Sequence, residues 1–309
     1  MLDTTIDRVV RVITEKAANL APARTRRAMQ RHARGREDTR NLQRADFAVV
    51  SFGKSGRTWL NTMIARFFQT RFQLKECVLF NFDNLHRKNR GIPKILFTHD
   101  NYIRDYVGCG DLKTAFYDKA TVLLVRHPGD VAVSQFFQWR YRMRPHKKTL
   151  NRYPAHGAEV SIFDFVMHQE AGLERAVAFL NEWAREMPRL KRLLTVRYED
   201  LRSDPAREMA RILTWLGQNP SDQEVRDCVE FASFENLKRL ESQQAFASSG
   251  KRIAPGDTGN PDSYKVRRAK VGGFRDYFDD DQVREIEAYI RAHLDPVFGY
   301  DSAAQSAAE

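Results

Sequence analysis

The chain has 309 residues, 42% of them hydrophobic, and a formal net charge of +11 at pH 7. This length suits one α/β domain with extensions, and the charge predicts an anionic partner: nucleic acid, anionic lipid, acidic polysaccharide or a phosphorylated small molecule. Three scattered cysteines (Cys77, Cys109 and Cys228) fit neither a disulfide framework nor a CxxC metal site. No window reaches about 18 unbroken apolar residues, and charges interrupt the apolar N-terminal stretch. These features argue against a secreted or membrane-spanning protein and predict a cytoplasmic one.

The first 45 residues are expected to form a basic helical extension. Four apolar residues are spaced for one helix face (Ile6, Val9, Val10 and Ile13), and Pro22 should break or kink the helix before an arginine-rich segment. Two interpretations remain open. The extension is either a solvated arm that covers the core, which we favour, or a basic amphipathic element in peripheral contact with the inner face of an anionic membrane.

Apolar strands alternate with helices from residue 46 onward. Strands are predicted over 46–51, 93–99, 121–126 and 193–201, the last running into a loop, and helices over 57–69, 130–141, 171–187, 205–216 and 280–294. This alternation predicts a single α/β domain over 46–300, with a central parallel sheet flanked by helices. The polar, Gly- and Pro-rich stretch 241–275 predicts a functional lid or a disordered segment, and 301–309 a disordered tail.

The stretch SFGKSGRTW at 51–59 follows the first apolar strand and opens the first domain helix. Gly53 and Gly56 permit close backbone approach, Lys54 adds a cation, and Ser55 and Thr58 add hydroxyl donors. A strand–loop–helix unit points several backbone N–H groups and the positive end of a helix at one place. The loop is therefore predicted to bind an anion, although an ordinary strand-to-helix turn is the simpler alternative.

A nucleoside triphosphatase loop, GxxxxGK[ST], fits this stretch incompletely. Its first glycine would fall at Ala48, and strand 121–126 ends in Arg126-His127-Pro128 where a magnesium-ordering aspartate is expected. An arginine there suits an anion and repels a metal ion. A kinase-like phosphotransferase with an irregular loop stays open as an alternative, and so does a non-catalytic binder of polyanions or membranes driven by the net charge.

Five segments, in order, resemble the sulfotransferases that use 3′-phosphoadenosine 5′-phosphosulfate (PAPS). SFGKSGRTW resembles the family's loop YPKSGTTW, VRHPGDVAVSQFF supplies Arg126 and Ser134 at the family's eight-residue spacing, and RRAKVGGFRDYF at 267–278 is similar to RKGxxGxWxxxF. YEDL at 198–201 and FASFENLK at 231–238 also resemble family segments. The resemblance runs from about Phe47 to Phe278. It implies a P-loop-like fold and sulfonate transfer to a hydroxyl, with PAPS as donor and without a metal ion.

The resemblance also implies a role for each matching position. The 5′ end of PAPS would be held by Lys54, Ser55, Gly56, Arg57 and Thr58, and its 3′-phosphate by Arg126, Ser134, Arg267 and Arg268. Trp59 and Phe234 would flank the adenine, with Tyr198 near its amine. His99, where the family has KTH, would be the general base, and Lys54 would stabilise the leaving oxygen. Residue type alone leaves core packing open for the aromatic residues, a structural role for His99 and a solvated basic run for Arg267 and Arg268.

Some positions depart from the family pattern. Phe97 stands where many members carry the lysine of KTH, and Arg57 replaces the first threonine of the loop. Ala269 replaces the glycine of RKG, Phe274 the usual tryptophan, and Ala232 a residue that often offers a hydroxyl to adenine. These changes leave open what replaces the missing lysine.

The acceptor is indicated only by segment 138–156, which combines basic and aromatic residues directly after the helix with Ser134. Such side chains suit a sugar, or a negatively charged glycan or glycolipid, and we expect this class of acceptor. An exposed basic loop is equally compatible with the segment. A small alcohol or phenol would prefer an apolar pocket, which no sequence window identifies.

Overall fold

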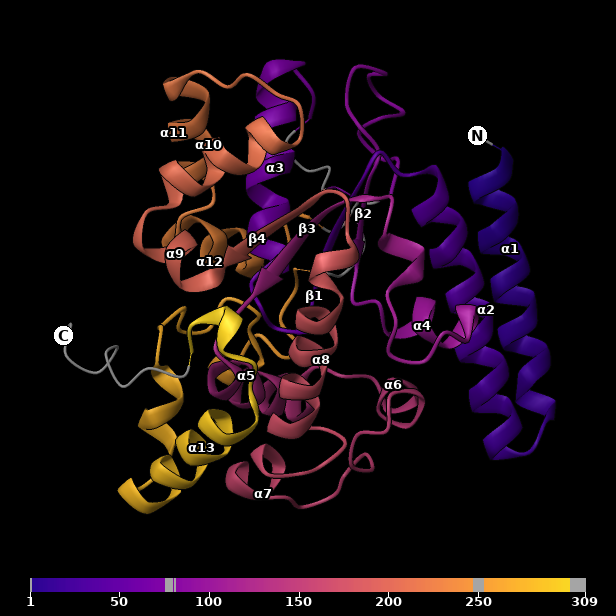
Figure 1. Ribbon diagram of the computed structural model, residues 1–309, viewed down its shortest axis with the longest axis vertical. Coiled ribbons are helices and arrows are strands. Elements are labelled where there is room, and N and C mark those ends of the chain that lie inside the picture. The colour runs from indigo at the N-terminus through magenta and orange to yellow at the C-terminus, as the bar shows by residue number, and fades with distance from the viewer. Residues whose placement is uncertain (1, 76–79, 81, 247–252, 301–309) are drawn as a thin grey trace.

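The computed structural model describes residues 2–75, 80, 82–246 and 253–300. Four parallel strands form one sheet in the order β2-β1-β3-β4 (Figure 1). They are β1 (Phe47–Ser51), β2 (Ile95–Thr98), β3 (Ala120–Val125) and β4 (Leu193–Arg197). Each overlaps a strand that the sequence predicts, and the parallel sheet between helices confirms the predicted fold class.

Helices cover both faces of this sheet (Figure 1). They are α1 (Leu2–Ala17), α2 (Ala23–Arg44), α3 (Arg57–Arg71), α4 (Asn101–Val107), α5 (Pro128–Tyr141), α6 (Pro145–Leu150), α7 (Ile162–Val166), α8 (Leu173–Glu186), α9 (Tyr198–Ser203), α10 (Pro205–Trp215), α11 (Asp222–Phe231), α12 (Phe234–Ser242) and α13 (Asp280–His293). One core cluster joins the sheet to α3 and α9–α12, and a second joins it to α2, α4, α5, α7, α8 and α13.

The central strands read as unbroken apolar runs because both of their faces are covered. In β1, Val49 belongs to the first core cluster, whereas Ala48 and Val50 belong to the second. β3 divides its side chains in the same alternating way, and all six of its residues are buried. This burial fixes the sheet, and with it the loops that leave the carboxyl ends of the strands.

The N-terminal arm consists of α1 and α2, which lie side by side at one edge of the molecule (Figure 1). As predicted, the helix breaks at Pro22, which directly precedes α2. α2 packs on α4 at Gly35, where an added Cβ atom would lie 2.1 Å from the carbonyl oxygen of Tyr102. The backbones of the two helices therefore touch, and α2 joins the arm to the domain.

Some local predictions differ from the structure. Tyr198 begins the short helix α9, where a loop was expected, and α6 lies inside segment 138–156. Within 241–275, the described residues end α12 and form single helical turns at Pro261–Ser263 and Gly273–Tyr277. Residues 247–252, the expected tail 301–309 and Cys77 lie outside the described residues, and Cys109 and Cys228 are free thiols. In the part of the chain that is described, no helix is both long enough and apolar enough to cross a bilayer.

Candidate functional site

A cavity of about 610 Å³ opens at the carboxyl ends of the strands. Segments that follow all four strands line it, which is the usual place for a ligand in an open α/β sheet. Among the residues predicted from the sequence, the lining includes Lys54, Gly56, Arg57, Thr58, Trp59, His99, Arg126, Ser134, Tyr198, Phe234, Arg267 and Arg268. Ser55 is the exception, because it is buried beneath the loop with 2% of its surface exposed.

The loop between β1 and α3 bends through left-handed backbone conformations. Lys54 has φ 74°, and Gly56, with φ 91°, immediately precedes the first residue of α3. A Cβ atom on Gly56 would lie 2.5 Å from Cδ2 of Tyr198, so the loop needs glycine there for space as well as for conformation. The loop thus places the N-terminus of a 15-residue helix at the cavity, which is a favourable place for an anion.

Lys54 lies within a group of cations. Burial, followed by the neighbouring Arg142 and Arg126, lowers the pKa of Lys54 to about 7. With this pKa, Lys54 is only partly protonated at neutral pH unless an anion offsets the positive charge of the neighbouring arginines. A bound dianion would favour the ammonium form and raise the pKa, so the charges of the cavity fit a phosphorylated ligand.

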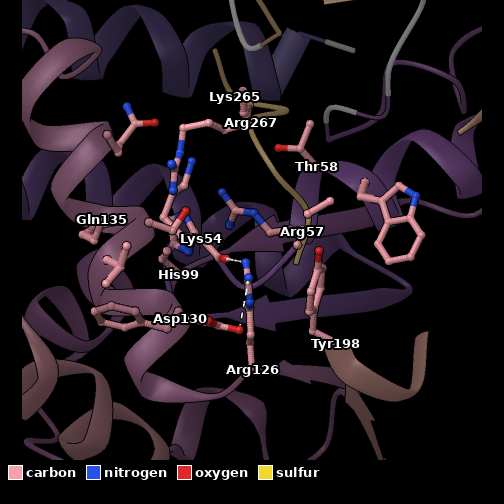
Figure 2. Close-up of a pocket in the computed structure, with 18 of the residues that line it drawn as sticks. Lys54, Arg57, Thr58, His99, Arg126, Asp130, Gln135, Tyr198, Lys265 and Arg267 are labelled. Atoms are coloured by element: carbon pink, nitrogen blue, oxygen red, sulfur yellow. Dashed lines mark hydrogen bonds and ion pairs between the residues drawn. The ribbon is translucent and has the colours of Figure 1, made fainter. Parts of the chain in front are cut away.

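Arg126 connects three segments around the cavity (Figure 2). Its Nη1 donates to the carbonyl oxygen of Lys54 at 3.2 Å, and its Nη2 donates to the carbonyl oxygen of Lys270 at 3.2 Å. The guanidinium lies 4.2 Å from the ring centroid of Tyr198. Its Nε is buried and has no hydrogen-bond partner among the described residues. Arg126 therefore joins the loop, the residues near Lys270 and α9, and retains one unmet donor.

Residues 265–274 form a strap along the cavity, and Asp130 of α5 holds its far end. The Asp130 carboxylate accepts from the backbone N–H groups of Gly272 and Phe274, both at 2.9 Å, and lies 3.4 Å from Nη2 of Arg126. The sequence analysis missed Asp130. Its position in the first turn of a helix, four residues after Arg126, is the only sequence signal for it.

Glu241, at the end of α12, holds the near end of the strap. It is fully buried, and its carboxylate accepts from the backbone N–H groups of Lys265 at 2.6 Å and Val266 at 2.8 Å. Arg142 donates to the same carboxylate at 3.0 Å, and also to the carbonyl oxygens of Ser263 and Ala254. The ion pair between Arg142 and Glu241 fixes the course of the strap, and no local sequence motif indicates this pair.

The two arginines of the strap are placed differently. Arg267 lies with its guanidinium 3.6 Å from the ring centroid of Phe137 and hydrogen-bonds the Tyr277 hydroxyl, and its side chain is 17% exposed. Arg268 pairs with Asp276 and is 42% exposed. Arg267 is thus the better placed of the two to contact a ligand inside the cavity.

Three aromatic side chains line the part of the cavity near α9 and α12. Trp59 and Tyr198 meet edge to face at 5.7 Å, and the Trp59 indole N–H donates to the carbonyl oxygen of Ala232 at 2.9 Å. Phe234, the first residue of α12, also lines the cavity. Phe274, the last residue of the strap, also lines the cavity and stacks on buried His127, with ring centroids 5.1 Å apart, so it packs the strap against the start of α5.

His99 follows β2 and is held by a backbone carbonyl. Its Nδ1 lies 2.7 Å from the carbonyl oxygen of Ser51, which can only accept, so Nδ1 carries the proton. In the neutral ring the lone pair is then on Nε2. The next residue, Asp100, pairs with buried Lys113 at 2.9 Å, and Lys113 also pairs with Glu182 at 2.8 Å. These ion pairs fix the turn that carries His99.

Polar and charged side chains also line the cavity near α4 and α6, and we call them the polar wall. It consists of Asn101, Tyr102, Lys147, Asn151, Tyr153 and Arg175. Asn151 Oδ1 accepts from the Tyr102 hydroxyl at 3.1 Å and from Nη1 of Arg31, an arm residue, also at 3.1 Å. Burial, and then nearby Arg34, lower the pKa of Lys147 to about 8. The basic and aromatic segment 138–156 pointed to part of this wall, but the contribution of the arm was missed.

Phe97 replaces a lysine of the family pattern, and its surroundings differ from those of a cavity residue. Phe97 packs against the apolar core, where its ring centroid lies 6.0 Å from that of Phe80, and it does not line the cavity. Lys265 and Arg57 do line the cavity, and they are candidates to supply the positive charge of the missing lysine. Within the described ranges, no cluster of three or more His, Cys, Asp or Glu side chains is arranged to hold a metal ion.

Comparison with known proteins gives one family. The sulfotransferase domain model matches residues 44–298. Curated relatives include flavonol 4′-sulfotransferase of Flaveria chlorifolia (26% identical over 37% of this chain and 36% of that protein), sulfotransferase 1A1 of Rattus norvegicus (23%, 62% and 67%) and cytosolic sulfotransferase 13 of Arabidopsis thaliana (23%, 81% and 77%). The aligned part thus spans about a third of the first relative and about two thirds of the second.

Solved structures with the same fold include two that contain a nucleotide. Mouse sulfotransferase SULT7A1 complexed with PAP has a TM-score of 0.54 and 20% identity, over 85% of this chain and 90% of that one. Retinol dehydratase in a complex with retinol and PAP has a TM-score of 0.53 and 19% identity, over 80% of each chain. At this level of identity the likeness establishes the shared fold.

Proposed function

Because the chain belongs to the sulfotransferase domain family, we propose that it transfers the sulfonate group of PAPS to an acceptor hydroxyl. The observation that carries this proposal is the convergence of the loop at 53–58, Arg126 with Ser134, and Arg267 on one cavity. Two separate phosphate-sized charges need two cationic sites, and the loop and the arginine group supply them. The unmet Nε of Arg126 and the lowered pKa of Lys54 support an anionic ligand between them.

The proposed reaction is an in-line displacement at sulfur. The acceptor oxygen forms a bond to sulfur as the bond between sulfur and the bridging phosphate oxygen breaks, and the electron pair of that bond stays on the phosphate. His99 Nε2 takes the proton of the acceptor hydroxyl. Lys54, together with the N-terminus of α3, stabilises the charge that develops on the leaving oxygen. Trp59, Tyr198 and Phe234 would bind the adenine.

The acceptor we propose is a sugar, or a glycan or glycolipid that carries a negative charge. The polar wall supports this choice, since amides, phenols and cations suit hydroxyl-rich ligands better than an apolar phenol. Lys147 Nζ lies 3.5 Å from the Tyr102 hydroxyl and 5.6 Å from its ring centroid, at the cavity surface. A small alcohol or phenol is the alternative acceptor. The similar proteins whose names or titles specify an acceptor or ligand concern a flavonol, retinol and androsterone.

We further propose that the enzyme works in the cytoplasm, as the sequence indicates. As part of this proposal, the basic N-terminal helix makes peripheral contact with the inner face of the membrane. Such contact requires the apolar face of that helix to be exposed.

Calorimetric titration tests the donor assignment. In metal-free buffer, adenosine 3′,5′-bisphosphate (PAP), the nucleotide left when the sulfonate departs, should bind at least tenfold more tightly than ATP. The physical reason is that only PAP offers a phosphate to each cationic site. A preference for ATP that requires Mg²⁺ would favour the phosphotransferase alternative. Absence of PAP binding alongside salt-sensitive binding to heparin would favour the polyanion binder.

The acceptor class is tested by Lys147→Met. For an acidic glycan acceptor, KM should rise about tenfold, since one contact between a cation and an anion is lost. For a neutral sugar, KM should change less than threefold, and PAP affinity should stay the same. Lys191→Met, at a surface lysine that is absent from the cavity lining, is the matched control. Equal changes in KM for acidic and neutral acceptors would contradict a role for Lys147 in recognising the negative charge of the acceptor.

A further inference from the structure

The amphipathic helix α1 turns its apolar face to solvent and its charged face to the protein. Its outer face, defined by Ile6, Val9, Val10 and Ile13, is open to solvent, with Ile6 49%, Val9 50% and Ile13 61% exposed. The spacing of these four residues places them on one stripe. Helices of globular proteins turn such a stripe toward the core. The sequence predicts the stripe but leaves open whether the arm covers the core or contacts a membrane.

Ion pairs on the opposite face of α1 set this orientation. Asp7 is 1% exposed and pairs with Arg44 at 2.8 Å and with Arg40. One turn further, Arg11 pairs with Glu37 of α2. After another turn, Glu15 pairs with Arg34 at 2.6 Å. Three successive turns thus bind α2 through charge, and rotating α1 to bury its outer face would break these four ion pairs and leave charges unpaired.

The outer face of α1 lies at the edge of the molecule, with α2 between it and the domain (Figure 1). Leu20, which follows the helix, is 93% exposed and extends the apolar surface toward α2. Single exposed aliphatic residues are common on proteins, but an uninterrupted helical stripe is a mark of an interaction surface.

Charge identifies the partner of this surface. Residues 1–45 contain eleven arginine or lysine residues against five aspartate or glutamate residues, so they hold more than half of the net charge of +11. Arg8, Lys16 and Arg24 are exposed residues of this arm. A second copy of the chain docked symmetrically would bring two such basic arms together, and their charges would repel. An anionic lipid surface offers an apolar layer for the aliphatic residues and negative headgroups for the basic ones.

We infer that the outer face of α1 binds the surface of an anionic membrane, with the helix parallel to the bilayer. This deepens the membrane contact proposed above by naming the face and the lipid charge, and it does not depend on the nucleotide site. The arm also reaches the polar wall, because Arg31 of α2 donates to Asn151 and, at 2.9 Å, to the carbonyl oxygen of Asn101. One intervening helix therefore links the lipid-binding face to the side of the cavity assigned to the acceptor.

Vesicle sedimentation tests this inference with the full chain. Wild-type protein should sediment with phosphatidylglycerol–phosphatidylcholine vesicles at 0.1 M salt, and should stay in solution with pure phosphatidylcholine vesicles or at 0.5 M salt. The double variant Val9→Asn/Ile13→Asn should bind the anionic vesicles at least tenfold more weakly. The matched control Thr5→Asn/Thr25→Asn, at two exposed threonines of the same arm, should bind as the wild type does.

Three outcomes would overturn the inference: no sedimentation of the wild type with anionic vesicles, unchanged binding of the Val9→Asn/Ile13→Asn variant, or equal binding to neutral vesicles. Light scattering provides a further check. A wild-type dimer that becomes monomeric in the same variant would assign the face to a second copy instead. PAP affinity, measured on each variant in solution, reports folding and the nucleotide site, so failure of membrane binding is distinguishable from failure of the sulfotransferase proposal.

Discussion

His99→Ala is expected to lower kcat for sulfonate transfer by roughly 10²–10⁴-fold, while the affinity for PAP stays within about twofold of the wild type. The reason is the tautomer. Since Nδ1 is committed to the carbonyl oxygen of Ser51 at 2.7 Å, Nε2 has the lone pair that can accept a proton. Alanine removes this acceptor and leaves the phosphate contacts intact. Single-turnover kinetics with saturating PAPS would measure the effect, and added imidazole should restore part of the rate.

The control for this variant is His293→Ala, at an exposed histidine at the end of α13. That change should leave kcat unaltered. A rate for His99→Ala within threefold of the wild type would remove His99 as the base. A low rate without imidazole rescue, accompanied by loss of PAP binding, would assign His99 a structural role in holding the turn between β2 and α4.

The second large effect is expected for Arg126→Ala, which should weaken PAP binding by more than 10²-fold, or about 3 kcal/mol. Arg126 is expected to pair with a phosphate, and it also bonds the carbonyl oxygens of Lys54 and Lys270. Its removal takes away a charge and loosens the loop and the strap together. Arg126→Lys keeps the charge but loses the forked geometry, so its affinity should lie between those of the wild type and the alanine variant.

Calorimetry measures the affinity, and thermal unfolding shows whether the fold survives. Arg284→Ala, at an arginine of α13 that is 68% exposed, is the control and should bind PAP normally. If Arg126→Ala unfolds, Ser134→Ala provides the same information, because Ser134 lines the cavity and should contribute about tenfold in affinity. Unchanged PAP binding in a folded Arg126→Ala variant, or in Ser134→Ala, would contradict the assignment of the 3′-phosphate to this group.

The sequence predicted the sheet well because its central strands, β1 and β3, are apolar runs covered on both faces. β1 and β3 are five and six residues long, and turn residues or prolines bound them. Short helices in polar segments, such as α6 and α9, were not predicted. Their stability comes from tertiary packing, and six residues form too few turns for a periodic pattern.

The candidate site was predictable where a motif is local. The loop from Gly53 to Thr58 and the pair Arg126 and Ser134 each lie within one strand–loop–helix unit, so the resemblance to family motifs could indicate a common binding surface. Asp130 and Glu241 were not predictable, because their partners are backbone N–H groups more than 20 residues away in sequence. The direction of the apolar face of α1 could not be predicted for a related reason. It is set by ion pairs with another helix, and amphipathic periodicity carries no information about them.

The anchoring of the strap has a consequence for biosynthesis. Asp130 and Glu241 bind backbone N–H groups between residues 265 and 274, so the strap that they hold is made after both of them in translation. A nascent chain that has already folded its sheet and the loop at 53–58 still lacks the wall that contains Arg267. The proposed donor site therefore becomes complete only after the strap, residues 265–274, has been synthesised.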